Sequence, residues 1–140
     1  ELASIQNRDN CVCFLLQAKI YIIKKMYKKA LKFLDECENL LGDKEIVFYE
    51  KTCVYMKEHN FEKAYEYCCK LTKINYNITE YHLMIIKCLI LQDRVIEGKF
   101  YYDKIPESNT MKKELKEIIK DFVEFKAVTI SEYSTSNKIS

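Results

Sequence analysis

The stretch that decides the fold is Ala18–Ala30, AKIYIIKKMYKKA, which reads as the end of one helix, a tight turn and the start of the next. Its pattern of small and apolar residues returns twice, each time after 34 residues. The repeated positions of the second helix are Tyr27, Ala30, Leu34 and Cys37, then Phe61, Ala64, Cys68 and Leu71, then Val95, Gly98, Tyr102 and Ile105. Those of the first helix are Phe14, Ala18 and Tyr21, then Phe48, Thr52 and Tyr55, then His82, Ile86 and Leu89.

The spacing of these residues predicts stacked helix pairs. Steps of three, four and three residues place each second-helix set on one face of an α-helix. One pair of this size cannot bury that face alone, so neighbouring pairs must stack to cover it. The small residue of each copy, Ala30, Ala64 or Gly98, marks the closest approach of two helices. A period of 34 with a fixed small residue resembles the tetratricopeptide repeat (TPR), which implies a right-handed solenoid.

We therefore predict an all-α chain with three TPR-like antiparallel helix pairs and a C-terminal capping helix. The predicted divisions are a frayed segment 1–10, repeats at 11–42, 45–76 and 79–106, a capping helix 109–128 and a disordered tail 129–140. An earlier helix is the alternative for residues 1–10, and Asp9 or Asn10 would cap the helix that follows, as Thr79 would cap a later one. The capping helix carries an apolar seam, and a coiled-coil or partner-binding helix is its alternative. The seam consists of Met111, Leu115, Ile118, Phe122 and Phe125.

The composition limits the kind of protein. The sequence has 140 residues, enough for one domain with a core, and only two glycines and one proline, which favours helices. A net charge of +2 does not produce a field that attracts nucleic acid, so we expect no direct DNA binding. No run of 18 apolar residues and no signal peptide is visible, so we expect no membrane partner and a cytoplasmic or nuclear location.

The sequence also argues against metal, cofactor and catalytic chemistry. Seven cysteines are an odd number, and most fall inside expected helices, which favours reduced thiols that act as small buried apolar groups. A metal site built from Cys11, Cys13, His59 and His82 would lack paired C-x-x-C spacing. No glycine-rich phosphate loop occurs, and both histidines stand apart from a nucleophile motif, which suits turn or packing residues. We expect no enzyme, no cofactor and no metal.

The first helices of such repeats line a concave groove, which is the predicted partner-binding site. Continuing the register gives Val12, Leu15, Lys19, Ile22 and Ile23, then Ile46, Tyr49, Cys53, Met56 and Lys57, then Glu80, Leu83, Lys87, Ile90 and Leu91. An apolar trough with three lysines would suit an amphipathic helix or an extended peptide with some acidic residues. The alternative is that another part of a longer solenoid fills it.

One familiar TPR activity is not expected. Chaperone-binding TPR domains hold a terminal carboxylate with a clamp of basic and amide side chains. The matching positions here are Leu15, Lys19, Glu50, Glu80 and Met84. Because Glu50 and Glu80 would repel a carboxylate, we expect no binding of chaperone tails.

The segment Phe14–Thr72 also resembles the auxiliary, ribosome-anchoring subunit of the N-terminal acetyltransferase A complex. The resembling residues are Ala18-Lys19-Ile20-Tyr21, Ala30, Asp35-Glu36, Lys51, Tyr55-Met56, Ala64, Glu66, Cys68 or Cys69, Lys70 and Thr72. The resemblance implies a scaffold that wraps a catalytic acetyltransferase subunit and docks it at the ribosome. It also implies an inositol-polyphosphate site near Lys19, Tyr21 and Lys51. A free-standing peptide-binding adaptor or sensor, and a subunit of another TPR assembly such as the anaphase-promoting complex, are the alternatives.

Overall fold

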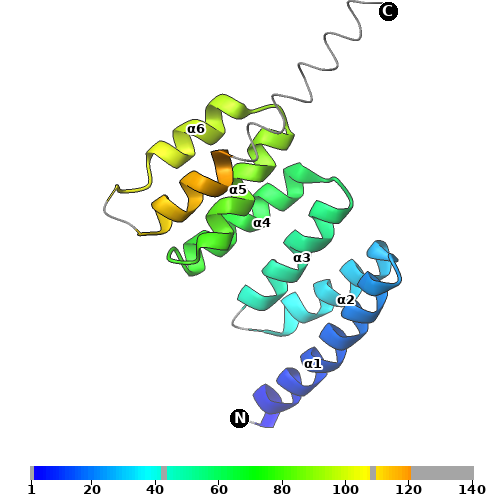
Figure 1. Ribbon diagram of the computed structural model, residues 1–140. Coiled ribbons are helices and arrows are strands. Elements are labelled where there is room, and N and C mark those ends of the chain that lie inside the picture. Colours follow the sequence, from blue (N-terminus) through cyan, green and yellow to red (C-terminus); the bar gives the residue numbers. More distant parts are fainter. Residues whose placement is uncertain (1, 42–43, 108–109, 121–140) are drawn as a thin grey trace, which may run out of the picture.

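The computed structural model describes residues 2–41, 44–107 and 110–120, and all its regular elements are helices (Figure 1). They are α1 (Leu2–Ile23), α2 (Tyr27–Leu40), α3 (Glu45–Lys57), α4 (Phe61–Ile74), α5 (Thr79–Leu91), α6 (Val95–Asp103) and a further helical stretch at 110–120, called the 110–120 helix below. No helix in this part of the chain combines the length and the apolar character that a membrane span requires. The predicted all-α fold is confirmed.

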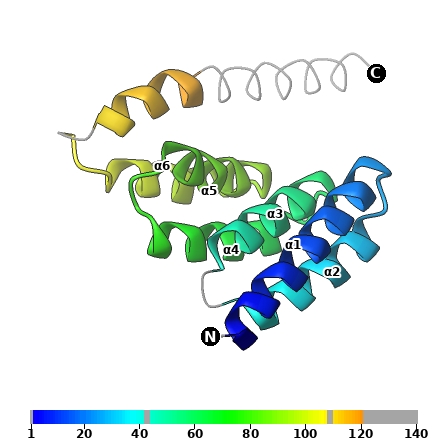
Figure 2. The same ribbon diagram turned by 90° about the horizontal axis from the view of Figure 1, so that it is seen from below.

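The helices pack in chain order, each against the next, from α1 to α6. Figures 1 and 2 show the pairs α1–α2, α3–α4 and α5–α6 stacked one after another. The packing follows the predicted register, since Ala30, Ala64 and Gly98 are all buried. Leu34 and Cys37 of α2 belong to one core cluster with residues of α3, which shows that successive pairs share a continuous core.

The turn inside each pair has the same backbone conformation. Lys25, His59 and Asp93, each 34 residues after the last, have φ values of 61°, 59° and 60°. In each turn the next amide donates to the carbonyl five residues before it, at 2.8, 2.9 and 2.8 Å. This left-handed closure of a helix end normally uses glycine, and none is present in these turns. The sequence therefore predicted the turns but not their strained conformation.

The buried glycine of the third pair offers a direct test of the packing. A Cβ built on Gly98 would lie 3.6 Å from Ile90 Cγ1 and 3.7 Å from Leu89 Cβ, which is ordinary van der Waals contact. Because alanine fits and loses less backbone entropy on folding, Gly98→Ala should stabilise the chain by about 0.5–1 kcal/mol. Chemical denaturation followed by circular dichroism measures this. Destabilisation would mean that α5 and α6 approach more closely than the structure shows.

Two predicted helix starts were wrong. α1 begins at Leu2 instead of near residue 11, so Asp9 and Asn10 lie inside the helix. The reason is that residues 2–10 contain no glycine or proline to stop it. Thr79 is the first helical residue of α5 and Ile78 is the cap position. The Thr79 hydroxyl instead donates to Glu114 Oε2 at 3.2 Å and ties α5 to the 110–120 helix. The seam residues Phe122 and Phe125 and the predicted tail lie outside the described residues.

The 110–120 helix covers the end of the stack, as predicted for a capping helix. Met111 and Leu115 form a buried cluster with Ile105, and Leu83 of α5 packs against it. The Lys112 ammonium is also buried and donates to the Ile105 carbonyl at 2.8 Å. A cation at this point satisfies a carbonyl just beyond the C-terminus of α6.

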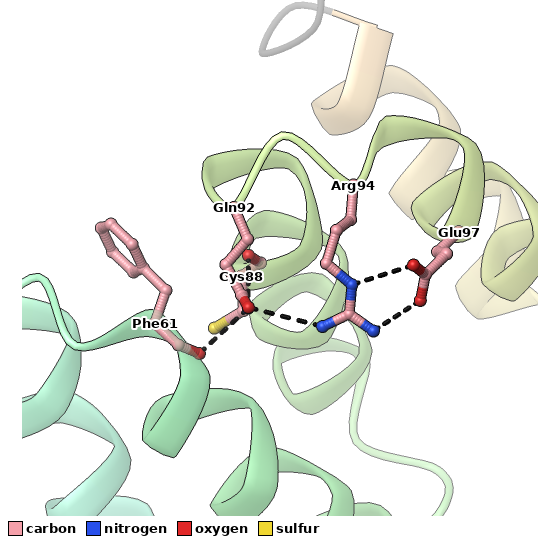
Figure 3. A network of polar contacts seen from close by, with 5 residues as sticks. All are labelled: Phe61, Cys88, Gln92, Arg94 and Glu97. Carbon is pink, nitrogen blue, oxygen red and sulfur yellow. Dashed lines mark hydrogen bonds and ion pairs between the residues drawn. The ribbon is translucent and has the colours of Figure 1, made fainter.

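Polar contacts join successive pairs at the end of α5 (Figure 3). The Gln92 amide donates to the Phe61 carbonyl at 3.3 Å and to the Cys88 carbonyl at 3.0 Å. Arg94 pairs with Glu97 through two hydrogen bonds of 3.0 and 2.5 Å. Gln92 therefore links the last turn of α5 to the first residue of α4.

The cysteines are mostly shielded, as predicted. Cys11, Cys37, Cys68 and Cys88 are buried, and Cys13 is the exposed one of the seven. The Cys37 thiol donates to the Cys11 carbonyl at 3.3 Å, and burial raises the pKa of this thiol to about 12. Such a group stays protonated and behaves as a small apolar side chain.

Candidate partner-binding site

A pocket of about 460 Å³ opens between the N-terminal turns of α3 and α5. These are the first helices of adjacent pairs, so the pocket lies on the face where the groove was predicted. Its lining residues are Glu45, Ile46, Tyr49, Ile78, Glu80 and Tyr81. Sequence reasoning had placed Ile46, Tyr49 and Glu80 in the groove, and the structure brings these three together.

Two tyrosine–carboxylate hydrogen bonds fix the walls of the pocket. The Tyr49 hydroxyl donates to Glu80 Oε1 at 2.8 Å, and the Tyr81 hydroxyl donates to Glu45 Oε1 at 2.7 Å. The two tyrosine rings lie 6.2 Å apart. The hydrogen bond to Glu80 and then burial raise the pKa of Tyr49, while burial and then the hydrogen bond to Glu45 raise that of Tyr81. Both phenols therefore remain neutral donors that hold the carboxylates in place.

The pocket combines an apolar wall with negative charge. Ile46 leaves 49% of its surface exposed, and Ile78 adds a second aliphatic group. Glu45 and Glu80 supply the charge, and no lysine or arginine is among the lining residues. An aliphatic stem that ends in a cation matches this surface, because tyrosine faces and carboxylates both attract positive charge.

Much of the predicted groove is less open than the sequence suggested. Tyr49, Cys53 and Met56 pack against the core cluster that α4 and α5 form, and the Cys88 thiol donates to Met56 Sδ at 3.3 Å. Ile90 is buried. The reason is that α3 and α5 contact each other at Met56, while Ile90 lies beside Gly98 of α6.

The other predicted groove residues divide between core and surface. Leu15 and Ile22 pack against the core cluster of the first pair, and Leu83 is covered by the 110–120 helix. Lys87 is half-buried, and Lys19 and Lys57 are exposed. The open part of the groove therefore has a few apolar side chains and two exposed lysines among its described residues. Its apolar members are Val12, Ile23 and Ile46.

The structure does not place Lys51 where a phosphate could reach it. Lys51 is 1% exposed, and its ammonium contacts Asp35 Oδ1 at 2.5 Å, Glu38 Oε2 at 2.8 Å and the Tyr67 hydroxyl at 3.3 Å. Burial alone would lower its pKa, but hydrogen bonds to these partners outweigh burial and raise it. Its charge already serves the contact between α2 and α3.

The other two candidate phosphate ligands lie on α1. Lys19 is exposed, and the Tyr21 ring stacks on Phe33 with the ring centroids 5.5 Å apart. The Lys29 ammonium lies 5.6 Å from the centre of the Tyr21 ring. Tyr21 thus contributes to packing between α1 and α2, and the structure does not unite these side chains with Lys51 in one pocket.

His82 is a buried packing residue, as the sequence suggested. Its Nε2 lies 2.6 Å from the Tyr76 carbonyl and its Nδ1 lies 2.5 Å from the Tyr101 hydroxyl. Since a carbonyl only accepts, Nε2 carries the proton and Nδ1 accepts from Tyr101. The ring thereby joins α5 to α6 and to the preceding linker. Among the residues that the structure describes, no group of three His, Cys, Asp or Glu side chains could hold a metal ion.

Three pocket residues were missed from the sequence. Glu45, Ile78 and Tyr81 fall outside the groove positions that the 34-residue register supplied. One signal was available, because both α3 and α5 carry glutamate in the first turn, at Glu45 and Glu80. Their nearness depends on how two helices stack, which the register alone does not give.

Comparison with known proteins supports the class of fold. No family model matches the sequence, and no curated protein matches it. Among solved structures, the chain is similar to the crystal structure of yeast Tom70, a TPR protein, with a TM-score of 0.64 and 11% sequence identity. The match covers 89% of this chain and 26% of the Tom70 chain, so this chain spans about a quarter of that structure. The fold is therefore a TPR-like helical repeat.

Proposed function

We propose that the protein is a non-catalytic scaffold that binds a segment of a partner protein on the face of its first helices. The pocket between α3 and α5 carries this proposal, because it is an open recess of about 460 Å³ on a repeat fold. The same surface brings together aromatic rings, aliphatic groups and carboxylates, which are the components of a specific peptide site. A lysine or arginine of the partner enters the pocket.

The charges on α3 give the partner segment a direction. Glu45 lies in the first turn of α3 and Lys57 in the last, and 12 residues at the helical rise separate them by about 18 Å. A segment that places its basic residue at the pocket meets the exposed Lys57 further along. An acidic residue at that point of the partner would speed association and improve specificity.

The pocket can be tested without disturbing the core. Ile46→Lys should weaken partner binding at least about tenfold, because it removes an apolar contact and places a cation beside Glu45 and Glu80. Ile74→Lys is the matched control, since Ile74 is 46% exposed at the end of α4 and does not line the pocket. Fluorescence titration with the partner measures both variants, and circular dichroism checks their folding. Equal binding by the two variants would exclude the pocket as the site.

The resemblance to the auxiliary subunit of N-terminal acetyltransferase A supports a narrower proposal. In this role the chain would hold a catalytic acetyltransferase subunit near the ribosome in the cytoplasm. Its support is the stretch Ala18-Lys19-Ile20-Tyr21 and the matching residues up to Thr72. Purification of the tagged chain from its native cell tests it, and the absence of both an acetyltransferase subunit and ribosomal proteins would exclude it.

A further inference from the structure

The outer face of α1 is apolar and uncovered. This α1 outer face consists of Cys13, Leu16, Gln17 and Ile20, and all four are exposed. Leu16 leaves 57% of its surface exposed and Ile20 leaves 50%. Positions four residues apart lie on the same side of the helix, so the two side chains form one stripe.

The equivalent faces of the other first helices are covered. In α3 the equivalent residues, 34 positions later, are Val47, Glu50, Lys51 and Val54, of which Glu50 is half-buried and the rest are buried. In α5, 68 positions later, they are Tyr81, Met84, Ile85 and Cys88, and all are buried. This face is therefore the stacking face of a first helix, and α1 is the one first helix of the three pairs described on which it is open.

The covering element in both cases is the preceding second helix. Val47 and Val54 of α3 share a core cluster with Leu34 and Cys37 of α2. In the next pair, Met84, Ile85 and Cys88 of α5 share a cluster with Ala64 and Cys68 of α4. The α1 outer face occupies the same register positions as these covered faces of α3 and α5.

We propose that the α1 outer face docks a helix of a partner protein, which stacks on α1 as α2 stacks on α3. The docking helix needs the pattern of the second helices, a small residue followed after four and seven residues by apolar ones. The examples in this chain are Ala30, Leu34 and Cys37, and Ala64, Cys68 and Leu71. Gln17 stands where α3 has Lys51, so the partner needs no counterpart of the acidic pair Asp35 and Glu38.

In a second copy of this chain, the second-helix stacking faces are covered in its described part, and the exposed Ile96 and Phe100 of α6 lie outside the small-residue pattern of those faces. The faces of α2 and α4 are covered by α3 and α5. Tyr102 of α6 packs against the cluster that Ile105, just beyond α6, forms with Met111 and Leu115 of the 110–120 helix. These covered faces favour a helix of a different protein over a second copy as the occupant, and this helix binds at a site separate from the pocket between α3 and α5.

Cys13 provides a native reporter, because it lies on the α1 outer face and is the exposed cysteine of the seven. The probe is a synthetic peptide of α4, Phe61–Ile74, held helical by a hydrocarbon staple between positions 62 and 66, both of which are exposed on α4. Saturating peptide should slow alkylation of Cys13 by iodoacetamide about tenfold or more, as measured by mass spectrometry. The same peptide with Ala64→Arg should leave the rate unchanged.

A covalent version removes the entropic cost of association. Residues 45–78 are duplicated and joined directly before Cys11 in place of residues 1–10, so that a copy of α4 precedes α1 through its own linker. In this graft Cys13 should be protected from alkylation, and the protection should disappear when the grafted copy carries Ala64→Arg. This result would support the docking face even if the peptide binds weakly. Unchanged reactivity in a graft whose added helicity is shown by circular dichroism overturns the proposal. Protection of Cys13 in the unaltered chain as its concentration rises would also overturn it, by showing that a second copy covers the face.

Discussion

Replacing Ala64 with arginine should unfold a large fraction of the protein, with a loss of about 3 kcal/mol or more in the free energy of unfolding. Ala64 has no exposed surface and lies in the cluster that α4 forms with Met84, Ile85 and Cys88. Overpacking alone costs about 1–3 kcal/mol, and an unpaired charge in an apolar core adds to that cost. Urea denaturation followed by circular dichroism at 222 nm, the standard helix wavelength, measures the change.

Glu66→Arg is the control for Ala64→Arg, because Glu66 is exposed on the same helix two residues later. An exposed substitution of this kind should change stability by no more than about 0.5 kcal/mol. If the two variants were equally stable, Ala64 would not lie between packed helices and the 34-residue register would be wrong.

Replacing Lys51 with alanine should lower the free energy of unfolding by about 2–4 kcal/mol. The variant leaves the Glu38 carboxylate and the Tyr67 hydroxyl without the buried ammonium that contacts them, and it removes the packed aliphatic stem. The cost falls below that of a fully buried ion pair, because Asp35 is 62% exposed and water can solvate it in the variant. Denaturation under the same conditions provides the measurement.

Two further variants separate the causes of this loss. Lys57→Ala removes an exposed lysine from the same helix and should change stability by no more than about 0.5 kcal/mol. Lys51→Met keeps most of the aliphatic stem, so it should lose less stability than Lys51→Ala. A neutral effect of Lys51→Ala would mean that Lys51 is solvated, and the inositol-phosphate site implied by the sequence resemblance would again be open to it.

The burial of Lys51 shows one limit of what can be predicted from the sequence. A lysine is almost always exposed, and the sequence around Lys51 does not mark it as different from Lys57. Its burial depends on Asp35 and Glu38, which α2 presents at the interface with α3. Two residues 13 or more positions away therefore decide its environment.

The groove shows a second limit. The register assigned Tyr49 and Met56 to the inner side of α3, but it could not show that these side chains pack against the cluster that α4 and α5 form. The open pocket appears only near the start of these helices, where Ile46 and Ile78 leave room beside Tyr81. How much of a repeat face stays open depends on the distance between neighbouring helices, which no single repeat encodes.

The sequence by itself determined the helices, their pairing and the buried stripes, because these depend on local spacing. Ala30, Ala64 and Gly98 could be placed at close contacts from a period that every copy obeys. The tertiary structure alone decided which equivalent positions remain exposed. Ile20, Val54 and Cys88 occupy one register position, yet only Ile20 is exposed, since burial requires a second helix to lie against the first.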